Sequence, residues 1–201
     1  ILNGIVNSLR MRYVYFMLNP EKTLVDFKDN VSLMTYGDDN IMSVKQKVNW
    51  FNHTAISKCF ASLGIGYTMA DKEAESVPFI NIDEASFLKR TWRYEETLGC
   101  MVAPLDHDSI EKMLMVWNRS KSVTEEAQGI SVISTALREY FFYGREVFDE
   151  KTNMFKQLVK DLKWDTWVED STFPTFEELC ESFKRSSRHS DSFDIYFPVG
   201  V

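Results

Sequence analysis

The sequence predicts an α+β fold, in which helices pack on one face of an antiparallel sheet and a mainly α-helical part follows. Over residues 1–104 the hydrophobic patterns come in the order helix, hairpin, helix, strand, strand. From about residue 105 onward the pattern is helical throughout. We therefore expect two parts, a sheet-containing part over 1–104 and a helical part over 105–201, divided at Pro104.

The composition is that of a folded protein. The chain has 201 residues, of which 44% are hydrophobic and 14% aromatic, enough to bury the core of one large domain or two small lobes. The formal net charge of -7 excludes a uniformly basic surface for nucleic acids. Any contact with nucleic acid must therefore use local basic groups or bound cations.

The cysteines, the apolar runs and the start of the chain indicate the cellular context of the protein. The three cysteines are odd in number and lack a C-x-x-C spacing, which favours neither a disulfide framework nor a zinc site and fits a reducing compartment. The apolar run 13–18 is too short to span a bilayer, and we expect no membrane insertion. Because the chain starts within a helical pattern and without Met, we expect a piece of a longer polyprotein.

The first helix and hairpin come from two patterns. Residues 1–18 read as a helix that Pro20 ends. Its expected buried face comprises Leu2, Ile5, Val6, Leu9 and Tyr13. The stretch VSLMTYGDDNIMSV, residues 31–44, then joins two apolar runs through Gly-Asp-Asp-Asn, which tolerates the backbone of a tight hairpin turn.

A second helix and two strands follow. An Asn or Thr near residue 52 caps the expected helix, Ile56, Phe60 and Leu63 share its face, and Gly64 ends it. IGYTMADKEA predicts a short strand that leads into a polar loop with Lys72. FLKRTWRYEE, residues 87–96, predicts another strand.

Four helices are expected in the second part, over residues 106–118, 124–144, 153–162 and 175–185. The first has Asp108 as its expected cap with Glu111 three residues later. Its apolar stripe comprises Ile110, Met113, Leu114 and Trp117. The last opens with a capping box formed by Thr175 and Glu178 and ends in a basic cluster, 184–189, that is either a solvated helix end or an RNA contact.

Adjacent carboxylates at a hairpin tip are candidates for a divalent-cation site. Mg²⁺ prefers hard oxygen ligands and binds through one or two carboxylates plus substrate phosphates. Asp38 and Asp39 alone are also ordinary turn residues. The complete tetrapeptide Tyr-Gly-Asp-Asp, however, is expected by chance in only about one in a thousand chains of this length.

Four segments, in this order, resemble RNA-dependent RNA polymerases of picornavirus-like positive-strand RNA viruses. LNGIVNS resembles part of the family's ribose-selecting helix, YGDD its metal-binding hairpin, LGIGYTMADK its lysine-bearing loop and FLKR its primer grip. The resemblance implies a partial polymerase palm over 1–104 and a thumb over 105–201, of which the thumb matches only in position and character.

The resemblance implies roles for individual residues. Asp38 and Asp39 are metal ligands in a two-metal nucleotidyl transfer, with Mg²⁺ as cofactor and Mn²⁺ as a substitute. Lys72 protonates the leaving pyrophosphate. Asn3 reads the ribose 2′-hydroxyl, although Gly4 follows it where the family more often has Ser or Thr. The primer-grip residues are Phe87, Leu88, Lys89 and Arg90.

Each of these roles has a plainer alternative. Lys72 alone reads as a solvated surface lysine, Asn3 as a residue capping the helix start, and 87–90 as an edge strand protected by charge. A reverse transcriptase also presents paired aspartates on a hairpin, but Gly37, Lys72 and FLKR favour the RNA polymerase. A non-catalytic remnant that binds RNA or protein is the alternative from another class.

The resemblance further implies partners and a location. The partners are template and primer RNA, ribonucleoside triphosphates, and the fingers and remaining palm from upstream in the same polyprotein. The family needs another aspartate from a preceding strand that this sequence lacks, so the chain alone is expected to be inactive. The expected location is the host cytoplasm, at viral replication complexes.

Overall fold

The computed structural model describes residues 1–116, 118 and 120–190, except for the side chains of 187–190. The chain divides into two compact units, Ile1–Trp92 and a second that begins at Arg93. The predicted α+β class agrees with this structure, which combines helices with two small antiparallel sheets. Trp117 and the side chains of 187–189, which the sequence singled out, lie outside the described residues.

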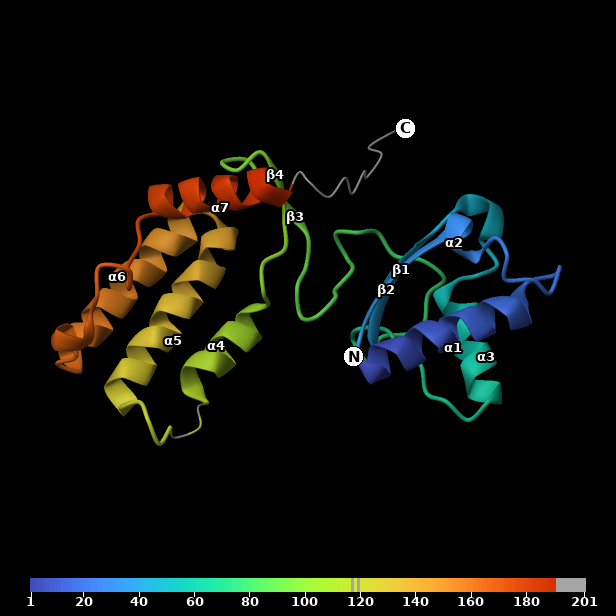
Figure 1. Ribbon diagram of the computed structural model, residues 1–201, viewed down its shortest axis with the longest axis horizontal. Helices are drawn as coiled ribbons and strands as arrows, with labels where there is room; N and C mark the ends of the chain where they lie inside the picture. Colours follow the sequence, from blue (N-terminus) through green and yellow to red (C-terminus); the bar gives the residue numbers. More distant parts are fainter. Residues whose placement is uncertain (117, 119, 191–201) are drawn as a thin grey trace. The chain divides into compact units, whose positions relative to one another are not determined.

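The first unit combines three α-helices with one hairpin. Its elements are α1 (Leu2–Leu18), α2 (Phe27–Asn30), β1 (Val31–Tyr36), β2 (Asp39–Val44), the 3-10 turn η1 (Gln46–Val48) and α3 (His53–Ser62). In Figure 1, α1 runs alongside the hairpin and next to α3. The core side chains are Met11, Val14, Tyr15, Phe27, Val31, Phe51, Ile56 and Phe60.

The predicted α1 is confirmed, but its predicted buried face is wrong. Leu2, Ile5 and Leu9 are 72%, 52% and 60% exposed. The buried face instead contains Asn7 and the core residues that follow it at helical spacing. Because α1 is apolar on most of its circumference, periodicity alone could not distinguish the two faces.

The hairpin has the predicted position and a tighter turn. Tyr36 pairs with Asp39, so the turn consists of Gly37 and Asp38 alone, and Asp39 begins β2. Gly37 has φ 60°, the left-handed conformation that hairpin turns with Gly at the first central position require. The face toward α1 carries Val31, Leu33, Thr35, Asn40, Met42 and Val44.

The second helix, α3, follows its sequence signals except at its end. The Asn52 side chain accepts a hydrogen bond from Ala55 N–H at 3.0 Å, and Ile56 and Phe60 are buried. Gly64, with φ 72°, ends the helix in the left-handed conformation. The prediction for Leu63 is wrong, since it lies past the last helical turn and is 45% exposed.

The strand predictions after α3 are wrong in part. Residues 65–69 form no strand in the described structure, because the segment packs on α3 through Tyr67 rather than on a strand. Within 87–96, Phe87 and Arg90 form an isolated bridge and β3 spans only Arg93–Glu95. β3 pairs with β4 (Cys100–Val102), which the sequence did not indicate.

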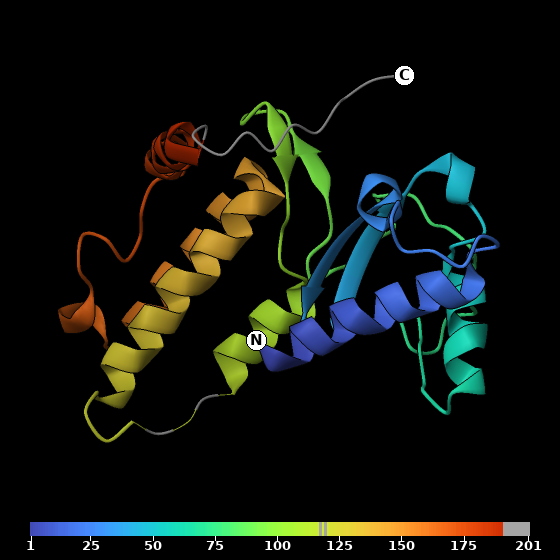
Figure 2. The ribbon, with the colours of Figure 1, turned by 45° about the vertical axis from the view of Figure 1, so that its right-hand side comes forward.

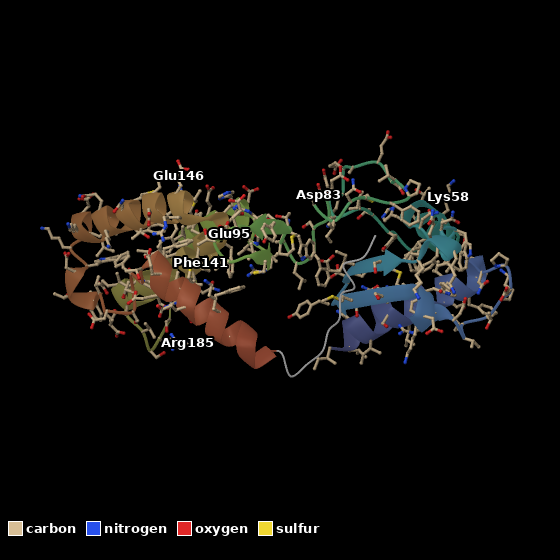
Figure 3. The ribbon with its side chains drawn as sticks, turned by 90° about the horizontal axis from the view of Figure 1, so that it is seen from above. Lys58, Asp83, Glu95, Phe141, Glu146 and Arg185 are labelled. Atoms are coloured by element: carbon tan, nitrogen blue, oxygen red, sulfur yellow. The ribbon has the colours of Figure 1, made fainter. Side chains whose placement is uncertain are left out.

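The second unit is helical apart from this β3–β4 hairpin. Its helices are α4 (His107–Met115), α5 (Glu125–Tyr140), α6 (Arg145–Asp161) and α7 (Phe176–Ser190), with 3-10 turns η2 (Phe141–Tyr143) and η3 (Asp165–Trp167). α5 and α6 are in contact, and in Figure 2 α5, in yellow, lies in front of α6. Figure 3 places Phe141 inside this unit and Glu146 at its surface, in agreement with their burial.

Two helix starts differ from prediction. Asp106, not Asp108, caps α4, because its carboxylate accepts the Ser109 N–H at 2.8 Å. α6 begins at Arg145 rather than near residue 153, since Phe148 packs into the core and extends the buried stripe toward the N-terminus. Leu158 and Leu162, which the periodicity placed inward, are more than 40% exposed.

The predicted capping box at α7 is confirmed and gives a stability prediction. Glu178 N–H donates to Thr175 Oγ1 at 3.2 Å, and Thr175 N–H donates to Glu178 Oε2 at 2.7 Å. Thr175→Ala is expected to lower the free energy of unfolding by about 1 kcal/mol. Urea unfolding checks this against Thr166→Ala, a threonine within η3, which should change stability less.

Candidate active site

The two aspartates occupy different positions at the hairpin tip. Asp38 is a turn residue with an exposed side chain, whereas Asp39 is half-buried and starts β2. By strand alternation, Asp39 lies on the face opposite to the one that packs on α1. The tip thus presents one carboxylate beyond the end of the hairpin and one on its outer face.

Asn7 of α1 holds the tip and was missed by the sequence reasoning. Its Nδ2 group lies 2.8 Å from the carbonyl oxygen of Asp38, 3.1 Å from that of Asp39 and 3.4 Å from that of Gly37. The residue is buried, with an exposed fraction of 7%. No sequence signal identified this residue, because the apolar pattern of α1 indicated the opposite face as the buried one.

A second contact joins the start of α1 to the hairpin. Thr35 Oγ1 donates to the Gly4 carbonyl at 3.0 Å. A Cβ on Gly4 would lie 3.6 Å from Gly37 N and from Thr35 Oγ1, so the backbone of α1 approaches the tip closely. Asn3, the predicted nucleotide-binding residue, is exposed at this end of α1, one helical turn from Asn7.

The predicted primer-grip segment lies against Asp39. Leu88 N–H donates to Asp39 Oδ2 at 3.0 Å. Leu88 and Lys89 form a tight turn with φ of 54° and 63°, closed by two hydrogen bonds between Phe87 and Arg90. Phe87 is buried, Arg90 half-buried, and Leu88 and Lys89 are exposed. The structure therefore brings the FLKR turn and the aspartates together.

Lys72 occupies an exposed turn. Asp71 orders this turn, because its Oδ1 accepts Glu73 N–H at 3.0 Å and its carbonyl accepts Ala74 N–H at 3.2 Å. Among the described residues, no hydrogen bond or ion pair links Lys72 to the aspartates. Residues 70–80 are exposed throughout.

Tyr67 and Asn40 extend the network behind the tip. Tyr67 O–H donates to Asn40 Oδ1 at 3.0 Å, and Asn40 Nδ2 lies 3.5 Å from Asn7 Oδ1. Burial raises the pKa of the Tyr67 hydroxyl above its ordinary value; the Asn40 hydrogen bond opposes this shift, and the charge of Asp39 adds to it. The hydroxyl therefore remains a donor at neutral pH.

The tip fits a divalent cation only in part. Carboxylates of Asp38 and Asp39 are the hard oxygen donors that Mg²⁺ prefers. One oxygen of Asp39 already accepts a backbone N–H, which leaves its other oxygen for a ligand. Among the residues that the structure describes, no group of three or more His, Cys, Asp or Glu side chains could hold a metal ion.

A comparison with known protein families identifies the family of this chain. The profile of the family "Viral RNA-dependent RNA polymerase" matches residues 1–189. The chain belongs to this family.

In the part of the chain that the structure describes, no helix combines the length and apolar character needed to cross a bilayer.

The relatives are polyproteins of picorna-like viruses. The chain is 33% identical over 164 residues to the replicase polyprotein of cricket paralysis virus, which covers 79% of this chain and 9% of the relative. It is 28% identical over 203 residues to the RNA1 polyprotein of cowpea mosaic virus, covering 96% of this chain and 10% of the relative. The chain thus spans about a tenth of the length of these relatives.

Proposed function

We propose that this chain provides the palm remainder and the thumb of an RNA-directed RNA polymerase that replicates a viral genome. The observation that carries the proposal is the tip arrangement, in which Asn7 holds the backbone of a carboxylate hairpin and the 87–90 turn binds Asp39. The test is Mg²⁺-dependent primer extension on an RNA template by the chain joined to its upstream coding region. Extension that requires Asp38 supports the proposal.

In this proposal Asp38 and Asp39 hold the metal. When bound there, Mg²⁺, or Mn²⁺ in its place, would supply activation of the primer 3′-hydroxyl and neutralise charge on the phosphates. The polypeptide contributes the rigidity of the tip, because the Asn7 amide fixes carbonyls on both sides of Asp38. Two metal ions need more carboxylates than the tip supplies, so the chain alone is inactive.

The other proposed roles belong to the exposed Lys72 turn and to the 87–90 turn. Lys72 protonates the leaving pyrophosphate, and Phe87, Leu88, Lys89 and Arg90 place the primer end through packing and phosphate contacts. The partners are template and primer RNA, ribonucleoside triphosphates, and the upstream fingers and palm. The place of action is the host cytoplasm, at replication complexes.

Asn3, which is proposed to read the ribose 2′-hydroxyl, gives a prediction that is paired with one for Asn7. Asn3 and Asn7 are one helical turn apart, and only Asn7 contacts the tip. Asn7→Asp replaces the amide donor with a carboxylate that repels the three carbonyls, so we expect about tenfold weaker preference for ribonucleotides over deoxyribonucleotides together with slower synthesis. Asn3→Asp is expected to weaken the preference alone, because the tip stays held.

Relative incorporation of ribonucleotide and deoxyribonucleotide by the complete polymerase measures this pair. Asn49→Asp, an exposed asparagine after η1, serves as the control and should leave the preference unchanged. An unchanged preference in the Asn3 variant removes Asn3 from the nucleotide site, and the same result for Asn7 limits that residue to holding the hairpin.

The non-catalytic remnant is the alternative proposal. The same primer-extension assay separates it from the enzyme, because a folded, RNA-binding protein that fails to extend a primer fits a remnant. The upstream coding sequence provides a second test. An intact aspartate-bearing strand there supports the enzyme, whereas stop codons or frameshifts support the remnant.

A further inference from the structure

His53 contacts both ends of the loop that carries Lys72. The loop runs over residues 68–75, between Tyr67 and Ser76. The imidazole of His53 stacks on the Tyr67 ring, with ring centroids 4.9 Å apart and an interplanar angle of 27°. Its Nδ1 atom lies 2.7 Å from Ser76 Oγ. One side chain at the start of α3 therefore closes the base of the loop.

The Ser76 end is held by a small hydrogen-bond cluster. Ser76 Oγ donates to Thr54 Oγ1 at 3.1 Å, and Thr54 Oγ1 donates to the Ser76 carbonyl at 3.4 Å. Because the hydroxyl protons of Ser76 and Thr54 are both donated in these two bonds, Ser76 Oγ can only accept from His53. The donor is therefore His53 Nδ1–H. Among the described residues, the buried Nε2 atom of His53 has no hydrogen-bond partner, so the hydrogen bond between the ring and the loop is made through Nδ1.

The Tyr67 end connects the loop to the carboxylate hairpin. Tyr67 donates through its hydroxyl to Asn40, which follows Asp39 in β2 and lies next to the Asn7 amide. Ser57 Oγ donates to the Tyr67 carbonyl at 3.0 Å, which fixes the backbone of the same residue on α3. The His53 ring thus stacks on Tyr67, and the Tyr67 hydroxyl is hydrogen-bonded to Asn40 of the hairpin.

We propose that His53 is a positioning residue that holds the Lys72 loop at a fixed place relative to the aspartate hairpin. This inference rests on the proposed role of Lys72 in the transfer step. Residues 70–80 are exposed, so the loop gains little order from burial. Closing a loop at its base restricts the positions open to its tip, and a reacting group held near its working position reacts faster.

Three substitutions in the complete polymerase test the two contacts of His53 separately. Ser76→Ala removes the hydrogen bond from the loop side. His53→Phe keeps an aromatic ring to stack on Tyr67 and loses the hydrogen bond. His53→Asn places an amide N–H near the position of Nδ1, so it keeps a donor for Ser76. It loses the ring that stacks on Tyr67. Ser62→Ala is the control, because it removes a serine hydroxyl bonded to Cys59 O at the far end of α3.

The readout is kcat and KM for single-nucleotide incorporation, in wild-type and Lys72→Leu backgrounds. We expect Ser76→Ala and His53→Phe to lower kcat about three- to tenfold with little change in KM, the size of one lost hydrogen bond. His53→Asn should recover part of this loss. In the Lys72→Leu background none of the three should slow incorporation further, because the group they position is gone.

A purely structural role would lower kcat equally in both backgrounds, and that result overturns the inference. Unchanged kcat in all three variants, with Lys72→Leu slow, also overturns it while leaving the role of Lys72 intact. A normal rate for Lys72→Leu would instead exclude Lys72 as the general acid, and the inference about His53 would fail with it. Hydrogen–deuterium exchange of the loop gives an independent check, since exchange over 68–76 must rise in His53→Phe.

Discussion

Asp38→Asn is expected to abolish primer extension by the complete polymerase, with a loss of about a hundredfold or more, while RNA binding stays within about twofold. The substitution keeps the size of the side chain and removes the negative charge that is proposed to hold Mg²⁺. Because Asp38 is an exposed turn residue, the hairpin does not depend on its carboxylate. The measurement is extension of a labelled primer on an RNA template, alongside RNA binding.

Asp83→Asn is the matched control for this result. Asp83 is an exposed carboxylate in the same unit, labelled in Figure 3, and its loss should leave extension unchanged. Thermal unfolding of the three proteins should coincide, because neither substitution touches the core. Normal synthesis by the Asp38 variant would exclude this hairpin as the metal site and with it the proposed polymerase mechanism.

The hairpin was predictable because its determinants are local. Two apolar runs, a Gly with positive φ and a two-residue turn lie within fourteen residues, and short-range pattern suffices to place them. The caps of α3 and α7 are local in the same sense. The residues proposed for the metal therefore fell where the sequence indicated.

The support of the hairpin was not predictable, because it depends on contacts between distant residues. Asn7 contacts carbonyls about thirty residues away, and Leu88 contacts Asp39 forty-nine residues away. The apolar pattern of α1 indicated the opposite face, since the position that holds the tip is an amide. Likewise, 65–69 reads as a strand, but its aromatic residue packs on α3 and no strand pairs with it in the described structure.

Several of the groups that hold the tip are uncharged, and one of them contacts only its backbone. Asn7 and Leu88 reach it through N–H donors, and Asn40 and Tyr67 lie behind it as uncharged polar groups. The Asn7 amide binds backbone carbonyls and not the carboxylates, so it holds the tip without neutralising either carboxylate. A lysine or arginine in place of Asn7 would compete with a bound cation for the charge of the carboxylates.

Lys72→Leu is expected to slow nucleotide incorporation about a hundredfold without abolishing it, because a positioned general acid contributes about 10²–10⁴-fold. Leucine keeps much of the apolar stem and removes the ammonium group. Lys72 lies in an exposed turn, so the substitution should leave stability unchanged. The measurement is the single-turnover rate at saturating nucleotide, where chemistry limits the rate.

Lys72→Arg separates proton transfer from charge. Arginine keeps the positive charge and does not release its proton in proteins, so it should be nearly as slow as leucine if Lys72 acts as an acid. A rate close to wild type in the arginine variant would instead assign Lys72 an electrostatic role toward the phosphates. Lys58→Leu, an exposed lysine on α3, controls for loss of charge in the same unit and should incorporate normally. An unchanged rate for Lys72→Leu itself would return Lys72 to the plain reading of a solvated surface lysine.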